Sequence, residues 1–174
     1  EDVLQSIRWS GYTNAVTMEL TGLTVGTEYK LQMLFTEKCC TRGWDIIIDD
    51  EVVLENFSPQ ETEGGINTMD TGAAVSFSFV AGSDTLTVVH LGNGGFPDNN
   101  PILDGFTLEV DPAAPVAHSL STAVSAFPFS SADDLDMTGT FLYAVNVGGG
   151  ATTQGDASFT PDDVDGVTVT AQNH

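Results

Sequence analysis

Short runs of alternating apolar and polar residues, separated by turn-forming residues, dominate this chain. In the clearest run, Tyr29, Leu31, Met33 and Phe35 occupy every second position. Similar runs occur at 15–20, 44–48, 52–57, 74–80, 86–91, 103–110, 140–147 and 167–171. Successive side chains of a strand point to opposite faces, so this pattern predicts strands with one buried face. Helical periodicity is almost absent. The sequence therefore predicts an all-β fold, an antiparallel β-sandwich of the jelly-roll-like kind.

The pattern divides the chain into three parts. Residues 1–110 carry most of the predicted strands and form the main body of the sandwich. Residues 111–136 are rich in Pro, Ala and Ser and are predicted to be a linker. Residues 137–174 form a tail in which strands resume. An extended linker of this length spans up to about 85 Å, whereas a domain of this size has a radius of gyration of about 15 Å. The tail can therefore complete its own sandwich or that of a neighbour.

The charge of the chain excludes several classes of partner. The sequence has 25 acidic and 4 basic residues, a net charge of −21, and no basic residue occurs in 43–174. Phosphate binding needs Lys and Arg, so nucleic acid and anionic membranes are poor partners. The chain has no stretch of 18 apolar residues, and we expect no membrane insertion. The abundance of Thr, Gly, Asp and Val is typical of an extracellular or cell-surface protein.

Five segments together carry a family pattern: 3–9, 31–37 with 43–53, 98–103, 144–149 and 155–162. In this rotated order they resemble the signature of malectin and malectin-like domains. The segment 144–149 is similar to the opening strand of that family, although here it lies near the end of the chain. The resemblance implies a β-sandwich that binds carbohydrate through loop aromatics and an acidic residue.

The resemblance also implies particular site residues. Trp9 and Phe159 match aromatic positions of the family, and Asp98 matches the acidic one. Aromatic faces stack on the C–H face of a sugar, while a carboxylate accepts hydrogen bonds from hydroxyls. Trp9 lies in the body and Phe159 in the tail, so such a site needs the two parts docked together. The plainer interpretation is that both aromatic rings cover the edge of the sandwich.

Cys39 and Cys40 are the only cysteines and stand where the family has an aromatic pair. Adjacent Cα atoms lie about 3.8 Å apart, below the usual span of a disulfide, so a vicinal bridge would be strained. Exposed free thiols seldom persist outside the cell. Three states are open to the pair: a vicinal disulfide, bridges to other chains, or buried free thiols.

Two short acidic runs are candidate calcium sites. Ca²⁺ prefers several oxygen ligands, and alternate Asp residues on a tight loop supply them. The candidates are Asp133, Asp134 and Asp136 in one run, and Asp162, Asp163 and Asp165 in the other. The alternative is a pair of solvated acidic turns. We expect no required cofactor, with Ca²⁺ as the possible exception.

Catalytic and modification motifs are sparse. The three histidines suggest no Ser–His–Asp set, and no glycine run has the form of a phosphate loop. We therefore expect a protein that is not an enzyme. Asn56-Phe57-Ser58 is the sole N-glycosylation sequon, and we expect Phe57 to point inward and Asn56 outward.

The displaced opening strand favours a structural or adhesive role. If each tail completes the sandwich of the next copy, the chain assembles head-to-tail into an extracellular fibre or array. The inserted strand would present Phe141, Tyr143, Val145 and Val147. Copies of the chain itself, and glycans, are then the expected partners. The alternative is a self-contained malectin-like carbohydrate-binding module of a secreted or cell-surface protein.

Overall fold

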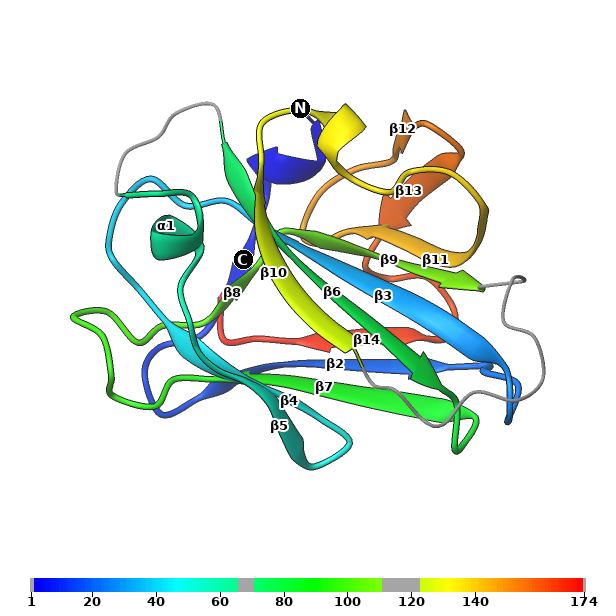
Figure 1. The fold of residues 1–174 in the computed structure, drawn as a ribbon, viewed down its shortest axis with the longest axis horizontal. Coiled ribbons are helices and arrows are strands. Elements are labelled where there is room, and N and C mark those ends of the chain that lie inside the picture. Colours follow the sequence, from blue (N-terminus) through cyan, green and yellow to red (C-terminus); the bar gives the residue numbers. More distant parts are fainter. Residues whose placement is uncertain (1, 66–70, 111–122, 174) are drawn as a thin grey trace.

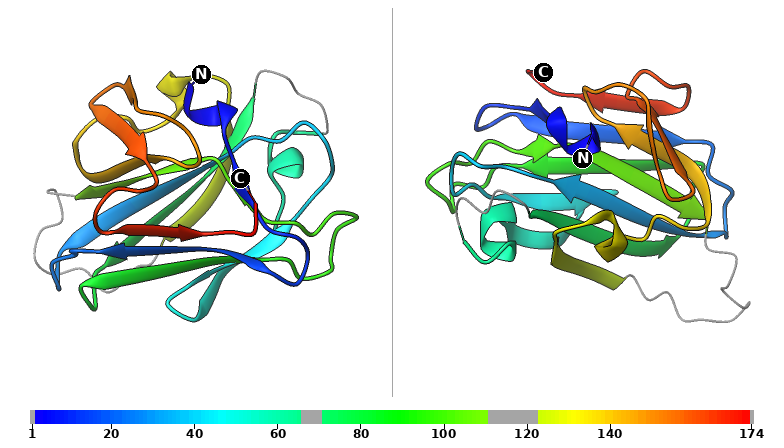
Figure 2. Two further views of the ribbon diagram at one scale, coloured as in Figure 1. Left: turned by 180° about the vertical axis from the view of Figure 1, so that it is seen from behind. Right: turned by 90° about the horizontal axis from the view of Figure 1, so that it is seen from above.

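The computed structural model describes residues 2–65, 71–110 and 123–173, and in these ranges the chain forms a β-sandwich (Figure 1). Two large sheets pack face to face, and strands from the tail lie among strands from the body (Figure 2). The predicted all-β sandwich is confirmed. No helix in the described ranges is long and apolar enough to cross a membrane.

The smaller of the two large sheets has five antiparallel strands. Their spatial order is β14 (Val167–Thr170), β2 (Ala15–Thr21), β7 (Thr85–Leu91), β4 (Trp44–Ile48) and β5 (Glu51–Phe57). Asp49 and Asp50, both with positive φ, form the turn between β4 and β5.

The larger sheet has seven strands. Their order is β10 (Ala123–Phe129), β6 (Gly72–Val80), β3 (Glu28–Phe35), β9 (Gly105–Val110), β11 (Thr140–Asn146), β13 (Ala157–Pro161) and β12 (Thr152–Gln154). The β11–β13 pair is parallel and the other pairs are antiparallel. The remaining elements are short: the 3₁₀ turns η1 (Asp2–Gln5) and η2 (Ala132–Asp134), helix α1 (Pro59–Thr62), and the pair β1 (Arg8–Trp9) and β8 (Ile102–Leu103).

The main hydrophobic core lies between the two large sheets. Tyr29, Leu31, Met33 and Phe35 are all buried in it, which confirms the face predicted from their alternation. Neighbouring Leu34 points to the opposite face of the seven-stranded sheet and belongs to a second, smaller apolar cluster. Because this sheet buries apolar side chains on both faces, its outer face is also covered by chain.

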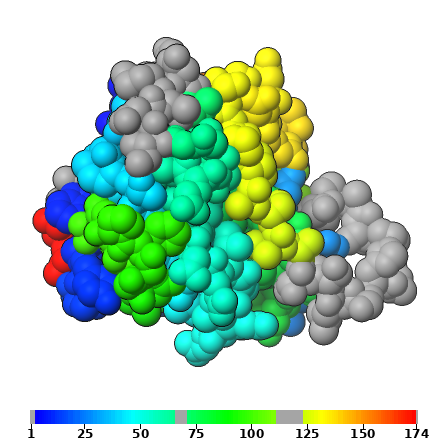
Figure 3. Space-filling model, turned by 60° about the vertical axis from the view of Figure 1, so that its left-hand side comes forward, coloured from blue at the N-terminus to red at the C-terminus, as the bar shows by residue number. Residues whose placement is uncertain are grey.

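Some of the buried side chains on that face come from a segment predicted to be a linker. Residues 123–129, within the predicted linker 111–136, form the edge strand β10 along β6. Its Ser, Ala and Pro residues hide the apolar–polar alternation that would predict a strand. The position of β10 is set by its partner β6, where the Phe129 ring occupies the space over Gly72. Pro128 is tolerated because an edge strand has one unpaired side. Figure 3 shows the exposed side of β10, in yellow, on the molecular surface. Residues 111–122 lie outside the described part.

The tail docks on the body of the same chain. Strand β11 lies between β9 and β13, and β14 pairs with β2 at the edge of the five-stranded sheet. Arg8 Nε is 2.7 Å from Asp162 Oδ2, and Trp9 exchanges two backbone hydrogen bonds with Asn173, at 3.0 and 3.2 Å. The tail therefore contributes strands to both sheets and complements its own sandwich.

Candidate functional site

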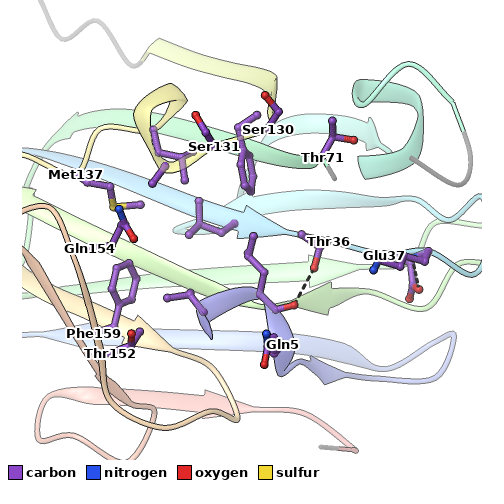
Figure 4. Close-up of a pocket in the computed structure, with 17 residues that line it drawn as sticks. Gln5, Thr36, Glu37, Thr71, Ser130, Ser131, Met137, Thr152, Gln154 and Phe159 are labelled. Atoms are coloured by element: carbon purple, nitrogen blue, oxygen red, sulfur yellow. Dashed lines mark hydrogen bonds between the residues drawn. The ribbon is translucent and has the colours of Figure 1, made fainter. Parts of the chain in front are cut away.

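A groove of about 680 Å³ opens on the outer face of the seven-stranded sheet. Five parts of the chain border it: η1, the end of β3 with the residues after it, Thr71 just before β6, the segment from the end of β10 to Met137, and the β12–β13 hairpin (Figure 4). Body and tail meet here, because η1 and β3 belong to the body while β12 and β13 belong to the tail. Docking of the tail therefore builds the groove.

The groove combines an apolar floor with a polar rim. Its floor consists of buried side chains of the second apolar cluster, namely Val3, Leu34, Phe129, Met137 and Phe159. Its rim carries mostly neutral hydrogen-bonding side chains together with one acid and one base, namely Gln5, Thr36, Glu37, Lys38, Thr71, Ser130, Ser131, Thr152 and Gln154. In Figure 4, Gln154 and Thr152 lie near Phe159 at one end, and Glu37 lies at the other.

A buried carboxyl group supports the wall of the groove. Asp104, which is 1% exposed, accepts hydrogen bonds from Thr36 N and Thr36 Oγ1, both at 2.9 Å. Thr36 Oγ1 also lies 3.3 Å from the carbonyl oxygen of Leu4, which places η1 against β3. Burial raises the pKa of Asp104 well above its usual range, although the two hydrogen bonds from Thr36 oppose this shift. The network fixes the position where β3 leads into the rim.

The loop after β3 is closed by buried Arg42. Its Nη2 lies 2.8 Å from Glu37 Oε2 and 3.3 Å from Asp98 Oδ2. Within this loop, Cys39 and Cys40 form a vicinal disulfide, the first of the three states open to the pair. Glu37 Oε1 accepts the backbone N–H groups of Lys38 and Cys39, each at 2.8 Å. The rim residues Glu37 and Lys38 are therefore held by a closed, cross-linked turn.

The structure does not bring the three predicted carbohydrate residues into one site. Phe159 lines the groove, where its buried ring forms part of the floor. Trp9 is half-buried, packs against the main core, and pairs with Ile102 on β8. Asp98 is engaged with Arg42. Trp9 and Asp98 therefore serve the packing and closure of the body, and Phe159 alone belongs to the groove.

Three of the six predicted calcium ligands contact other protein groups, and Ca²⁺ binding stays a prediction. Asp134 Oδ2 accepts the backbone N–H groups of Ser130 and Ser131, and these bonds lower the pKa of its carboxyl group. Asp136 contacts Lys30, and Asp162 pairs with Arg8. The other candidates, Asp133, Asp163 and Asp165, are exposed. Within 2–65, 71–110 and 123–173, no group of three or more His, Cys, Asp or Glu residues is arranged to hold a metal ion.

The sequon lies on the surface at the end of β5. Asn56 is exposed and Phe57 is 4% exposed, which confirms the predicted orientation of both residues. Asn56 has a φ of 53°, and its Oδ1 accepts a hydrogen bond from Asn93 at 2.9 Å. Ser58, buried, caps α1 through Glu61 N. N-glycosylation of Asn56 stays a prediction.

Most of the groove residues escape prediction from the sequence. Phe129, Ser130 and Ser131 lie inside the predicted linker, where alternate Phe127 and Phe129 were the available signal. Gln5 and Gln154 are far apart in the sequence, and single glutamines carry no motif. Comparisons of the chain with protein-family models, with curated proteins and with solved structures found no match.

Proposed function

We propose that the protein is a non-catalytic carbohydrate-binding module of a secreted or cell-surface protein, and that it binds glycan in the groove on the outer face of the seven-stranded sheet. The observation that carries this proposal is the make-up of the groove, in which a buried apolar floor is bordered by neutral amides and hydroxyls. A glycan has the complementary surface, with C–H groups on the ring faces and hydroxyls around them.

The charge of the site favours a neutral glycan over an anionic ligand. Glu37 and Lys38 contribute opposite charges to the rim, and the molecule as a whole is strongly acidic. An anionic ligand would be repelled by this field. The rim amides of Gln5 and Gln154 both donate and accept hydrogen bonds, as sugar hydroxyls do.

Binding fits the groove better than hydrolysis does. Most glycosidases place two carboxyl groups across the scissile bond. Among the described residues that line the groove, Glu37 is the only carboxylate. Buried Asp104 lies behind Thr36 and is engaged by it. A single carboxylate that is held by Arg42 is suited to accept hydrogen bonds from a bound sugar.

The test measures glycan binding by variants of the exposed rim amides. After a glycan array has identified a ligand, Gln5→Ala and Gln154→Ala are expected to weaken its binding about fivefold each, since a lost hydrogen bond is worth about 1 kcal/mol. Isothermal titration calorimetry gives the affinity. Gln172→Ala is the matched control, because Gln172 is an exposed amide that contacts Gly11, away from the groove.

Two results would count against the proposal. The first is the absence of binding to any glycan of the array. The second is a loss of affinity in Gln172→Ala or Trp9→Phe with none in Gln5→Ala and Gln154→Ala, which would move the glycan to the region of β1.

A further inference from the structure

Lys30, Glu109 and Asp136 form a compact group of one amine and two carboxylates on the seven-stranded sheet. Lys30 on β3 lies directly opposite Glu109 on β9, and its Nζ is 2.8 Å from Glu109 Oε2. Asp136 follows η2, and its Oδ2 is in direct contact with the same Nζ. One amine is therefore held between two carboxyl groups that come from different parts of the chain.

Two further residues hold Asp136 in place, one through its backbone and one through its carboxyl group. Gln32 accepts the Asp136 N–H at 3.2 Å and donates to its carbonyl oxygen at 3.3 Å. Thr138 donates its backbone N–H and its hydroxyl to Asp136 Oδ1, at 3.3 and 3.2 Å. Oδ2 therefore faces the amine, while Oδ1 faces two donors. Such donors stabilise the oxyanion that forms when a nucleophile attacks a carboxyl carbon.

The group rests as an ion pair. Burial opposes the ammonium form, but the hydrogen bonds to Asp136 and Glu109 raise the pKa of Lys30 overall. Proton transfer from Nζ to a carboxylate inside the group yields a neutral amine and a carboxylic acid without exchange with solvent. The Glu109 side chain is 12% exposed and that of Asp136 is 42% exposed. Glu109 is thus the shielded proton carrier, and Asp136 is the group from which water can leave.

We propose that Lys30 and Asp136 condense into an isopeptide bond, with Glu109 as the proton carrier. Lys30 Nζ attacks Asp136 Cγ, and Glu109 takes the proton that the nitrogen loses. Thr138 holds the oxyanion on Oδ1. Glu109 then gives the proton to the Oδ2 hydroxyl, which leaves as water while the C–N bond remains. One amine and one carboxylic acid give one amide and one water molecule, so the step needs no oxidant and no cofactor.

The fold supplies the driving force for this condensation. Amide formation between separate molecules in water is opposed by the excess of water. Reacting groups held in contact act as if present at effective molarities of about 10⁵–10⁸ M, which outweighs that excess. The new bond would tie β3 of the body to Asp136, the residue just before the tail. It is independent of glycan binding, and its test uses a different measurement.

The intact mass of the folded, full-length chain tests the proposal. After reduction of Cys39–Cys40, the wild-type mass is expected to fall short of the sequence mass by one water molecule. Lys30→Arg keeps a cation between the carboxylates and is expected to show the full mass, as is Glu109→Gln, which lacks the proton carrier. Lys38→Arg is the matched control, because Lys38 is the other lysine of the chain and is expected to retain the loss.

Peptide mapping then locates the bond. An amide at Nζ blocks trypsin after Lys30, so the expected product is peptide 9–38 joined to peptide 43–174. Fragment ions should place the link at Asp136. The full mass in the folded wild-type protein would overturn the proposal, even if a variant failed to fold. A link that maps to Glu109 or to any other residue would overturn it as well.

Discussion

His90 is a buried ionisable side chain in the main core. It is 1% exposed, its ring centroid lies 5.5 Å from that of Phe35 and 6.2 Å from that of Trp44, and its Nε2 is 3.4 Å from Met33 Sδ. Burial lowers the pKa of His90 to about 4 from an ordinary value of 6.5. The folded state therefore keeps the imidazole neutral in a pH range where the unfolded chain protonates it.

This difference predicts acid sensitivity of the fold. As the pH falls from 6.5 to about 4, His90 binds a proton in the unfolded state but not in the folded state. The free energy of unfolding should then fall by about 3 kcal/mol over this interval. His90→Phe keeps a packed ring without titration and should lose this slope, as measured by urea denaturation at a series of pH values. Equal slopes in both proteins would contradict the assignment.

Wild type and variant must be compared at each pH, because the titration of Asp104 changes the free energy of unfolding in the opposite direction. Its pKa is raised by burial, so its contribution to stability falls as the pH rises through the folded-state pKa. Subtracting the two curves removes this shared contribution and leaves that of His90.

At the scale of elements, β11 has the largest structural role in the tail. It lies between β9 and β13, and its Val145 is fully buried in the main core. Alternation alone predicts which residues of β11 and of the position just after it face inward, and it places Tyr143, Val145 and Val147 correctly against the core. The predicted fourth member, Phe141, packs against the outer cluster instead. A register shift between Phe141 and Tyr143 accounts for this change of face.

The central position of β11 predicts a large difference between two similar substitutions. Val145→Thr places a hydroxyl in the core and should destabilise the protein by about 1–3 kcal/mol. Val124→Thr on edge strand β10, where the side chain is 36% exposed, should change stability by less than about 0.5 kcal/mol. Urea denaturation measures both. Near-equal effects would mean that β11 is not an interior strand in solution.

At the scale of the whole molecule, the tail is joined to the body by backbone ladders and by the Arg8–Asp162 ion pair. The same contacts can form between two copies, because exchange of a tail leaves every pairing intact. Head-to-tail assembly through Phe141–Val147 thus stays a prediction beside the proposed glycan binding. The two roles are compatible.

Assembly predicts multiples of the chain mass at high protein concentration in native buffer, measured by light scattering. If tails exchange together with Asp136, the residue just before the tail, the proposed Lys30–Asp136 bond would join different copies, and the oligomers would survive denaturing electrophoresis. Lys30→Arg serves as the control, since its oligomers should dissociate in detergent. A sharp mass of one chain over the full concentration range would exclude assembly.

The sequence by itself determined the fold class and the inward face of strands such as Tyr29–Phe35. It could do so because the two-residue period is a local property of a strand that is buried on one side. The exposed Asn56 beside buried Phe57 followed from the same rule.

Only the tertiary structure decided which distant residues share a site. The groove joins Gln5, Glu37 and Gln154, and the amine of Lys30 meets Glu109 and Asp136, through sheet pairings that no local period encodes. Strand β10 was missed for the same reason, because its register is set by β6 rather than by its own pattern. The three predicted sugar-binding residues do not share a site. Trp9 packs against the main core and Asp98 pairs with Arg42, which leaves only Phe159 in the groove, and such contacts depend on the whole chain.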